Sequence, residues 1–430
     1  MIRKFILSAI LVPFLFLILC TITYATPTIT ARNAILIDYT TGEVLYEYNA
    51  HSVAYPASTT KILTALLALE KLHLDEVVTV DYDIYVPGSS MYLLKGESFT
   101  VEELIKATLI RSANDAAELL AVHISGSVDD FSKLMNLRAR ELGARNSNFT
   151  NAHGMPDSSH VTTAFDLAMI TRHAMSFDLF REIVSTVNLQ FQPTELTPNM
   201  RIYRNSNRFL WGTGSRNQMN YYGNYVDIKY DLVDGVKTGF TNSAGQCLVS
   251  SAISDDHRLI AVVLGATGTN IYTDSRSLLD YGFLNYRLVQ IADLNLHVTD
   301  AAVLNSESIT IPLVTENSLY KALPREINTY EIDKKITVFE DVSAPINKGE
   351  ALGRISYSYN DEFLGAVNLV AADNAIVKLT FWDKHGRNLK YLLAFFSIFV
   401  AWKIFVEYVR NKRRRRKLLF SKKRKTYNKN

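Results

Sequence analysis

The sequence predicts an α+β domain, a small all-β domain after it, and one apolar segment near the C-terminus. Strand-like runs at 33–50 and 234–266 enclose a long stretch with helical patterning. From 296 to 378, short strand-like runs alternate with Pro, Asn and Gly, and helical periodicity is almost absent. Residues 389–409 are then mostly apolar. Strands at both ends of the first region favour one α+β domain whose two ends share a sheet.

Residues 1–25 have the pattern of a secretory signal peptide. A basic start precedes apolar residues 5–20, and Thr-Tyr-Ala at 23–25 forms a small-x-small exit. The residue before Cys20 is a leucine, which is too large for a typical lipoprotein cleavage site. We therefore expect export and cleavage after residue 25, which leaves Cys247 as the single cysteine and no intramolecular disulfide.

The C-terminal end indicates attachment to a membrane. Residues 410–430 hold twelve lysines and arginines and no acidic residue, while the whole chain has a formal net charge of +3, so the rest of the chain is net negative. A basic surface for nucleic acid is therefore not expected. Beside an apolar segment, the positive-inside rule favours an anchor at 389–409 and a cytoplasmic basic tail at 410–430, with the exported body on the outer face of the cytoplasmic membrane. The uninterrupted apolar run 391–402 is shorter than the roughly 20 residues of a span, so both a spanning and an interfacial helix remain open.

We expect the exported part of the chain to form two domains, one at 28–290 and the β-rich domain at 296–378. Residues 33–50 form a predicted hairpin with a Thr-Thr-Gly turn. Thr100 and Glu103 form a capping box ahead of a helix at 101–110. A second helix is predicted to begin near Ser112 and a third to run from about Val128 to Gly143. Two later segments, 234–253 and 257–266, are each expected to be one strand.

A serine and a lysine stand three residues apart at the start of an apolar helix, in the stretch "YPASTTKILTALLALE" at 55–70. Residues at i and i+3 share a helix face, so Lys61 can reach the hydroxyl of Ser58. A lysine activates a serine only when it is neutral, which requires desolvation or a nearby cation. The pattern alone is weak, because the same spacing recurs at Ser318 and Lys321, where we assign no role.

Two further short motifs strengthen the first one. Ser112 and Asn114 form an S-x-N at the predicted start of the second helix, where Ser112 would by itself be an ordinary N-cap. Lys237, Thr238 and Gly239 form the single K-T-G in the chain, on a predicted strand. A strand with a lysine and a nearby glycine lets a substrate backbone lie against it while ammonium and hydroxyl meet a carboxylate.

The order S-x-x-K, S-x-N and K-T-G in an exported protein resembles the serine penicillin-recognising enzymes. Within them, the chain looks most like the low-molecular-mass D-alanyl-D-alanine carboxypeptidases. The likeness extends from about 30 to 400 and includes the hairpin "ARNAILIDYTTGEVLYEYNA", the stretches "GSSMYLLKGESFTVEELIKATLIRSANDAAELLA" and "NAHGMPDSSHVTTAFDLA", and "NSNRFLW". It implies the penicillin-recognising serine transferase/hydrolase fold, in which an antiparallel sheet carries a helical layer, followed by a small all-β domain and a C-terminal membrane helix.

The resemblance also implies a role for each motif residue. Ser58 attacks the carbonyl between the two terminal D-alanines of a peptidoglycan pentapeptide, Lys61 is the base, and Ser112 relays the proton. Substrate binding falls to four residues: Asn114, Lys237, Thr238 and Gly239. Backbone N–H groups of Ser58 and Phe240 form the oxyanion hole, and Lys237 depresses the pKa of Lys61. No cofactor or metal is implied, and β-lactam antibiotics are expected to acylate the serine. Some relatives carry histidine after K-T-G, so any role of an imidazole does not transfer to Phe240.

Other readings compete with the carboxypeptidase. A β-lactamase of class A adds a glutamate in an E-x-x-x-N pattern, and Glu195 to Asn199 is a literal match that we interpret as coincidence. A transpeptidase would use the same residues but usually carries a large N-terminal region. A non-catalytic, membrane-tethered module for cell-wall binding would not need the intact set of motif residues. His153 and His160 lack a third metal ligand at suitable spacing, and Cys247 reads as a buried small residue.

Overall fold

The computed structural model describes residues 26–427, with side chains described up to residue 419. The signal peptide expected at 1–25 lies outside the described residues. The chain separates into two compact units: unit 1 comprises residues up to 289 together with 320–330, and unit 2 comprises 290–319 and the chain from 331 onward. The segment 320–330 thus belongs to unit 1, although it lies within the sequence range of the predicted β-rich domain.

Unit 1 is built on a five-stranded antiparallel sheet in the order β2-β1-β11-β10-β9. These strands are β1 (Asn33–Asp38), β2 (Val44–Tyr48), β9 (Val233–Thr241), β10 (Gly245–Ser254) and β11 (His257–Ala266). The first strand pairs directly with the last, with Ile35 opposite Val262, so the two ends of the domain share a sheet as predicted.

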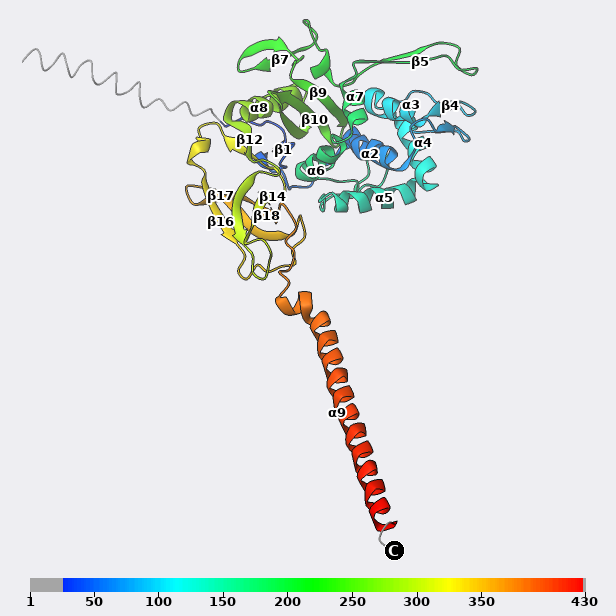
Figure 1. Ribbon diagram of the computed structural model, residues 1–430. Helices are drawn as coiled ribbons and strands as arrows, with labels where there is room; N and C mark the ends of the chain where they lie inside the picture. The colour runs from blue at the N-terminus through cyan, green and yellow to red at the C-terminus, as the bar shows by residue number, and fades with distance from the viewer. Residues whose placement is uncertain (1–25, 428–430) are drawn as a thin grey trace, which may run out of the picture. The chain divides into compact units, whose positions relative to one another are not determined.

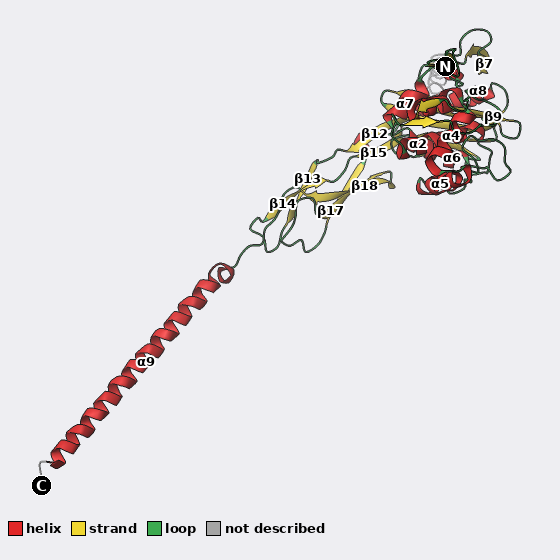
Figure 2. Ribbon diagram, turned by 90° about the vertical axis from the view of Figure 1, so that its right-hand side faces the viewer, coloured by secondary structure: helices red, strands yellow, loops and turns green. Residues whose placement is uncertain are grey.

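The sheet is buried on both faces, and strand alternation divides its side chains between two apolar cores. Ile35 and Ile37 of β1 belong to one core, and Leu36 to the other. The first core is completed by the helices listed here: α2 (Lys61–Lys71), α3 (Val101–Lys106), α4 (Asn114–Ser125), α5 (Val128–Glu141), α6 (Ala164–Ala174) and α7 (Asp178–Ser185). The second core is covered by α8 (Asn270–Asn285), and Figures 1 and 2 place β9 between α8 and the group of α2, α4, α5 and α6.

Short elements complete unit 1. The hairpins are β3 (Val77–Thr79) with β4 (Ser98–Thr100), β5 (Asn188–Phe191) with β6 (Arg201–Arg204), and β7 (Gln218–Tyr221) with β8 (Asn224–Asp227). A 3₁₀ helix η1 (Ala57–Thr60) precedes α2, a π-helical turn η2 (Ala107–Arg111) follows α3, and 3₁₀ turns η3 (Arg208–Leu210) and η4 (Thr329–Glu331) lie later in the chain. Strand β15 (Leu319–Pro324) pairs with β12 (Tyr286–Ala292).

Three local predictions were wrong in detail. The segment 234–253 forms two strands rather than one, because the chain turns at 242–244 and Gly245 begins β10 with φ +73°. The helix predicted at 101–110 has the expected capping box at Thr100 and Glu103, but its last turn widens into η2. Ser112 ends that turn in a left-handed conformation, with φ 62°, and is not the N-cap of α4.

Unit 2 contains a five-stranded antiparallel sheet in the order β13-β14-β18-β17-β16. Its strands are β13 (His297–Ala302), β14 (Thr310–Thr315), β16 (Asp333–Val338), β17 (Ala351–Tyr359) and β18 (Glu362–Ala371). The last described element is α9 (Phe381–Tyr427), which is long and apolar enough, by length and composition, to cross a membrane. The predicted fold class, an α+β domain with an all-β domain and an apolar C-terminal helix, is confirmed.

Candidate active site

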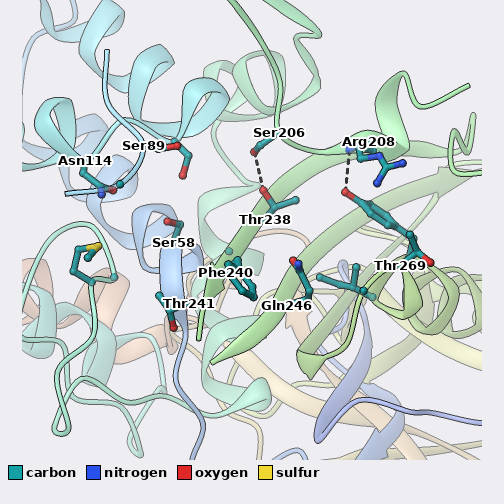
Figure 3. Close-up of a pocket in the computed structure, with 18 residues that line it drawn as sticks. Ser58, Ser89, Asn114, Ser206, Arg208, Thr238, Phe240, Thr241, Gln246 and Thr269 are labelled. Atoms are coloured by element: carbon teal, nitrogen blue, oxygen red, sulfur yellow. Dashed lines mark hydrogen bonds between the residues drawn. The ribbon is translucent and has the colours of Figure 1, made fainter. Parts of the chain in front are cut away.

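A cavity of about 620 Å³ in unit 1 brings the three sequence motifs together. Its walls include Ser58, Ser112 and Asn114 from the helical side and Thr238, Gly239 and Phe240 from β9. Figure 3 shows Ser58 near the middle of the cavity, with Asn114 and Ser89 on one side and Thr238, Ser206 and Arg208 on the other. Segments more than a hundred residues apart in sequence thus meet around one hydroxyl.

Ser58 and Lys61 lie on adjoining helical turns. Ser58 is half-buried in η1, and Lys61 opens α2 with a side chain that is fully buried. The Lys61 amine lies 3.1 Å from Ser58 Oγ, and it donates to Asn114 Oδ1 and to the backbone oxygen of His153, both at 2.7 Å. Because these two oxygens can only accept, a neutral amine would satisfy both and still turn its lone pair to the Ser58 hydroxyl.

The environment of Lys61 favours that neutral form. Burial lowers the pKa of Lys61 well below its usual range, and the charge of Lys237 lowers it further, against the opposing effect of Asp115. Lys237 is itself buried, and burial lowers its pKa to about 7. Its ammonium donates to the backbone oxygen of Thr238 at 2.9 Å. Lys237 is absent from the part of the cavity wall that the structure describes, so in this geometry it acts on Lys61 through charge.

Asn114 is held on both sides of its amide. Its Oδ1 accepts from Lys61, and its Nδ2 donates to the backbone oxygen of Pro87 at 2.5 Å. Its backbone N–H donates to Ser89 O at 2.7 Å. The first residue of α4 therefore joins the lysine to the loop at 87–89, and its orientation is defined by these partners.

Strand β9 and the loop at 154 approach η1 so closely that only glycine fits at the two points of contact, Gly239 and Gly154. A Cβ on Gly239 would lie 2.8 Å from the backbone nitrogen of Ser58. A Cβ on Gly154, which has φ +83°, would lie 1.8 Å from the backbone oxygen of Ala57. The Gly239 contact places the β9 backbone at 239–240 beside the Ser58 backbone, where two N–H groups can converge on one oxygen.

Sequence comparison decides the family of this site. Residues 21–268 match the family described as D-alanyl-D-alanine carboxypeptidase. The chain belongs to this family. Residues 286–376 match a second family, described as the penicillin-binding protein 5, C-terminal domain.

Individual carboxypeptidases of the family are similar over most of their length. D-alanyl-D-alanine carboxypeptidase DacF of Bacillus subtilis is 31% identical over 358 residues, which cover 82% of this chain and 87% of the relative. D-alanyl-D-alanine carboxypeptidase DacC of Escherichia coli is 31% identical over 366 residues, which cover 82% and 86%. The crystal structure of penicillin binding protein 5 from Haemophilus influenzae superposes with a TM-score of 0.67 at 27% identity, covering 82% of this chain and 99% of that structure.

Several residues around this carboxypeptidase site lie outside the three sequence motifs. Asp115 is buried and accepts from the backbone N–H groups of Met91 and Leu93 at 3.1 and 3.0 Å. Ser206 accepts a hydrogen bond from Thr238 Oγ1 at 2.7 Å, and Arg208 lines the same end of the cavity. Both lie in the "NSNRFLW" stretch, which the sequence marked without assigning roles.

The structure also accounts for the other residues that the sequence singled out, namely Glu195, Asn199, His160 and Cys247. Glu195 and Asn199 are exposed in the loop between β5 and β6 and are not on the cavity wall within the described residues. His160 is buried, its Nε2 lies 2.8 Å from Thr60 Oγ1, and burial lowers its pKa to about 4. Burial raises the pKa of Cys247 to about 11. Within residues 26–427, no three His, Cys, Asp or Glu side chains gather as possible metal ligands.

We expect Gly239→Ala to lower the acylation rate of Ser58 by penicillin by about 100-fold, because the new methyl would push β9 away from the Ser58 backbone by a fraction of an ångström. Acylation is followed with a fluorescent penicillin. The matched control is Gly386→Ala in α9, where a Cβ meets nothing within 4 Å and φ is not positive. Acylation at the normal rate in Gly239→Ala would contradict the close approach.

Proposed function

We propose that this chain is a serine DD-carboxypeptidase that removes the terminal D-alanine from peptidoglycan pentapeptide stems and thereby limits cross-linking. The proposal rests on one observation, the contacts that surround the Lys61 amine. A buried amine with two acceptors and one hydroxyl around it is arranged to take a proton from Ser58. Membership of the carboxypeptidase family supports the same reaction.

The reaction begins with attack of Ser58 Oγ on the carbonyl carbon between the two D-alanines, while neutral Lys61 accepts the hydroxyl proton. The oxyanion that forms is bound by the backbone N–H groups of Ser58 and Phe240. Ser112, at the cavity wall, passes the proton to the departing amine, and the C–N bond breaks. Water then attacks the acyl-enzyme, releases the shortened stem and restores Ser58. Asn114 keeps Lys61 in place throughout.

The terminal carboxylate belongs at the end of the cavity formed by Thr238, Ser206 and Arg208. Two hydroxyl groups and a guanidinium are donors suited to a carboxylate. The buried ammonium of Lys237, beside Thr238, adds positive potential to the same end. Gly239 lets the substrate backbone lie along β9. Penicillin carries a carboxylate next to a reactive carbonyl, so it would enter in the same orientation and acylate Ser58.

We assign catalysis to residues 28–290, a supporting role to the β-rich region 296–378, membrane anchoring to 389–409 and a cytoplasmic position to the basic tail 410–430. Described apolar side chains of α9 such as Phe395, Ile398 and Phe405 are exposed, as expected of a helix that needs a lipid environment. The β-rich region would act as a spacer between membrane and wall. The body would face outward from the bacterial cytoplasmic membrane.

The test of activity is the release of D-alanine from a synthetic pentapeptide ending in D-Ala-D-Ala by the full-length chain in detergent. We expect release in the wild type and a loss of at least about 1,000-fold in Ser58→Ala, because the nucleophile is removed. Ser318→Ala, in the second S-x-x-K, is the matched control and should keep full activity. No release, but Ser58-dependent penicillin labelling, would favour a transpeptidase. The absence of both signals would favour the wall-binding module.

The acylation rate should rise with pH through the pKa of Lys61, because the neutral amine is the active form. Removing the charge of Lys237 in Lys237→Gln should raise the pKa of Lys61 and move the rising limb to higher pH by about one unit. The measurement is the rate of fluorescent-penicillin labelling at a series of pH values. Lys229→Gln, at a half-exposed lysine paired with Asp231, should leave the profile unchanged. A limb that stays in place in Lys237→Gln would contradict the electrostatic coupling.

Membrane orientation is tested by adding protease to intact protoplasts that express the chain with a C-terminal tag. We expect the catalytic unit to be degraded and a short tagged fragment to survive, because the tail would lie inside. Protoplasts broken before the protease is added should lose the tag. Loss of the tag from intact cells would contradict a spanning anchor and favour an interfacial helix.

A further inference from the structure

A buried histidine lies behind the catalytic turn, and the reaction described above gives it no task. His160 is 2% exposed, and it ends the 150s loop (150–160), in which the backbone oxygen of His153 accepts from Lys61. We propose that His160 is a positioning residue for acylation: it fastens this loop to η1 and thereby holds the His153 oxygen against the Lys61 amine. The inference rests on the proposed function and extends it to a residue outside the three motifs.

The hydrogen bonds of His160 fix its tautomer. Its Nδ1 accepts from the backbone N–H of Thr150 at 3.0 Å, so the proton of the neutral ring is on Nε2. That Nε2 lies 2.8 Å from Thr60 Oγ1, and the Thr60 hydroxyl donates its own proton to the backbone oxygen of Ala57 at 2.8 Å. The hydroxyl is therefore the acceptor of the histidine proton, and one directed chain of hydrogen bonds runs from the 150s loop into η1.

The surroundings of His160 keep its ring neutral. Burial is the main cause that lowers the pKa of His160 to about 4. The charges of His153 and Lys61 act in the same direction, and the Asp157 carboxylate opposes them. A proton added to Nδ1 would face the N–H of Thr150, so a cationic ring could not keep both of its partners. At neutral pH the chain of hydrogen bonds is thus complete.

The 150s loop transmits this attachment because its own hydrogen bonds make it stiff. The Asn151 side-chain oxygen accepts from the backbone N–H groups of His153 and Gly154 at 3.3 and 2.7 Å. His153 Nδ1 accepts from the backbone N–H of Met155 at 3.2 Å. A Cβ on Gly154 would lie only 2.9 Å from Thr60 Oγ1, so the loop and the hydroxyl that holds it are in direct contact. A change at this hydroxyl therefore moves the backbone that carries the oxygen acceptor.

A second attachment limits how far the loop can move. Thr64, one turn after Thr60 on the same helical face, donates through Oγ1 to the backbone oxygen of Ala152 at 2.6 Å. Removal of the Thr60 hydroxyl should therefore loosen the loop beside Ser58 without releasing it. We accordingly expect a loss of rate that is far smaller than the loss caused by removing the nucleophile.

The experiment compares Thr60→Ala with Thr60→Ser, two variants that differ by the one hydroxyl that accepts from His160. The maximal rate of acylation of the full-length chain by a fluorescent penicillin should fall about 30-fold in Thr60→Ala and stay within about threefold of wild type in Thr60→Ser, because a displaced acceptor disturbs the orientation of Lys61. The penicillin concentration that gives half the maximal rate should be unchanged, since Thr60 is not on the wall of the cavity within the described residues.

A second pair of variants tests the histidine itself. The amide of His160→Gln takes the place of Nε2 and can still donate to Thr60, whereas the shorter amide of His160→Asn replaces only Nδ1. We expect His160→Gln to be acylated at least about fivefold faster than His160→Asn. The control is Thr171→Ala, which removes a buried hydroxyl that donates to the backbone oxygen of Leu167 at 2.7 Å within α6 and should be acylated at the wild-type rate.

The pH profile separates positioning from a loss of stability. When the His153 oxygen moves away, the ammonium form of Lys61 loses an acceptor and its pKa falls. The rising limb of the acylation rate should therefore move to lower pH by about half a unit in Thr60→Ala. The charges of Lys237 and Asp115, which also act on Lys61, are the same in this variant. A domain that is only destabilised would lose rate at every pH while the limb stays in place.

The outcomes distinguish the positioning role from the reaction. Equal acylation of Thr60→Ala and Thr60→Ser, or a rising limb that does not move, would overturn the role of His160 and leave the carboxypeptidase intact. Failure of penicillin to acylate wild type would overturn the proposed function and this inference with it. If circular dichroism shows that Thr60→Ala does not fold, the comparison of the two His160 variants decides in its place, and equal rates in that pair would overturn the inference.

Discussion

The buried amine of Lys61 is the group on which the arrangement of this domain depends. Placing an amine in the core is costly unless every N–H finds an acceptor or the group loses its charge. Here the two available acceptors come from different parts of the chain, one from the start of α4 and one from the backbone at His153. The lysine therefore connects η1, α2, α4 and the 150s loop, and its need for partners places Ser58 at their meeting point.

The sheet contributes to the same centre from the opposite side. Its edge strand β9 carries the K-T-G residues, and the two buried cores keep the sheet fixed between α8 and the other helices. Glycine at 239 and at 154 removes the side chains that would otherwise separate the strand and the 150s loop from η1. The buried ammonium of Lys237 and the hydroxyl groups of Thr238 and Ser206 then act on a cavity whose width is set by backbone contact rather than by flexible side chains.

Features that depend on neighbouring residues could be predicted from the sequence. The capping box at Thr100 follows from two residues three positions apart, and the hairpin at 33–50 follows from alternation and a glycine turn. Features that depend on distant partners could not. Ser112 has the composition of an N-cap, yet the loop at 87–93 binds the following helix through Asn114 and Asp115, and the chain at Ser112 adopts a left-handed turn instead. The three catalytic motifs could be identified as a set from the sequence. The place of Ser206 and Arg208 at the cavity could not, because it depends on the packing of η3 beside β9.

The return of residues 320–330 to unit 1 has a consequence for biosynthesis. Strand β15 pairs with β12, and within this segment Lys321 forms an ion pair with Glu43 while the Ala322 N–H donates to the same carboxylate at 2.9 Å. Glu43, in the N-terminal hairpin, thus binds residues that are synthesised almost three hundred residues later. Since the chain passes through part of unit 2 before it supplies that partner, a nascent catalytic unit on the ribosome is incomplete until translation has passed residue 330. The last contacts of the catalytic unit are acquired only after residues 290–319 of unit 2 have been synthesised.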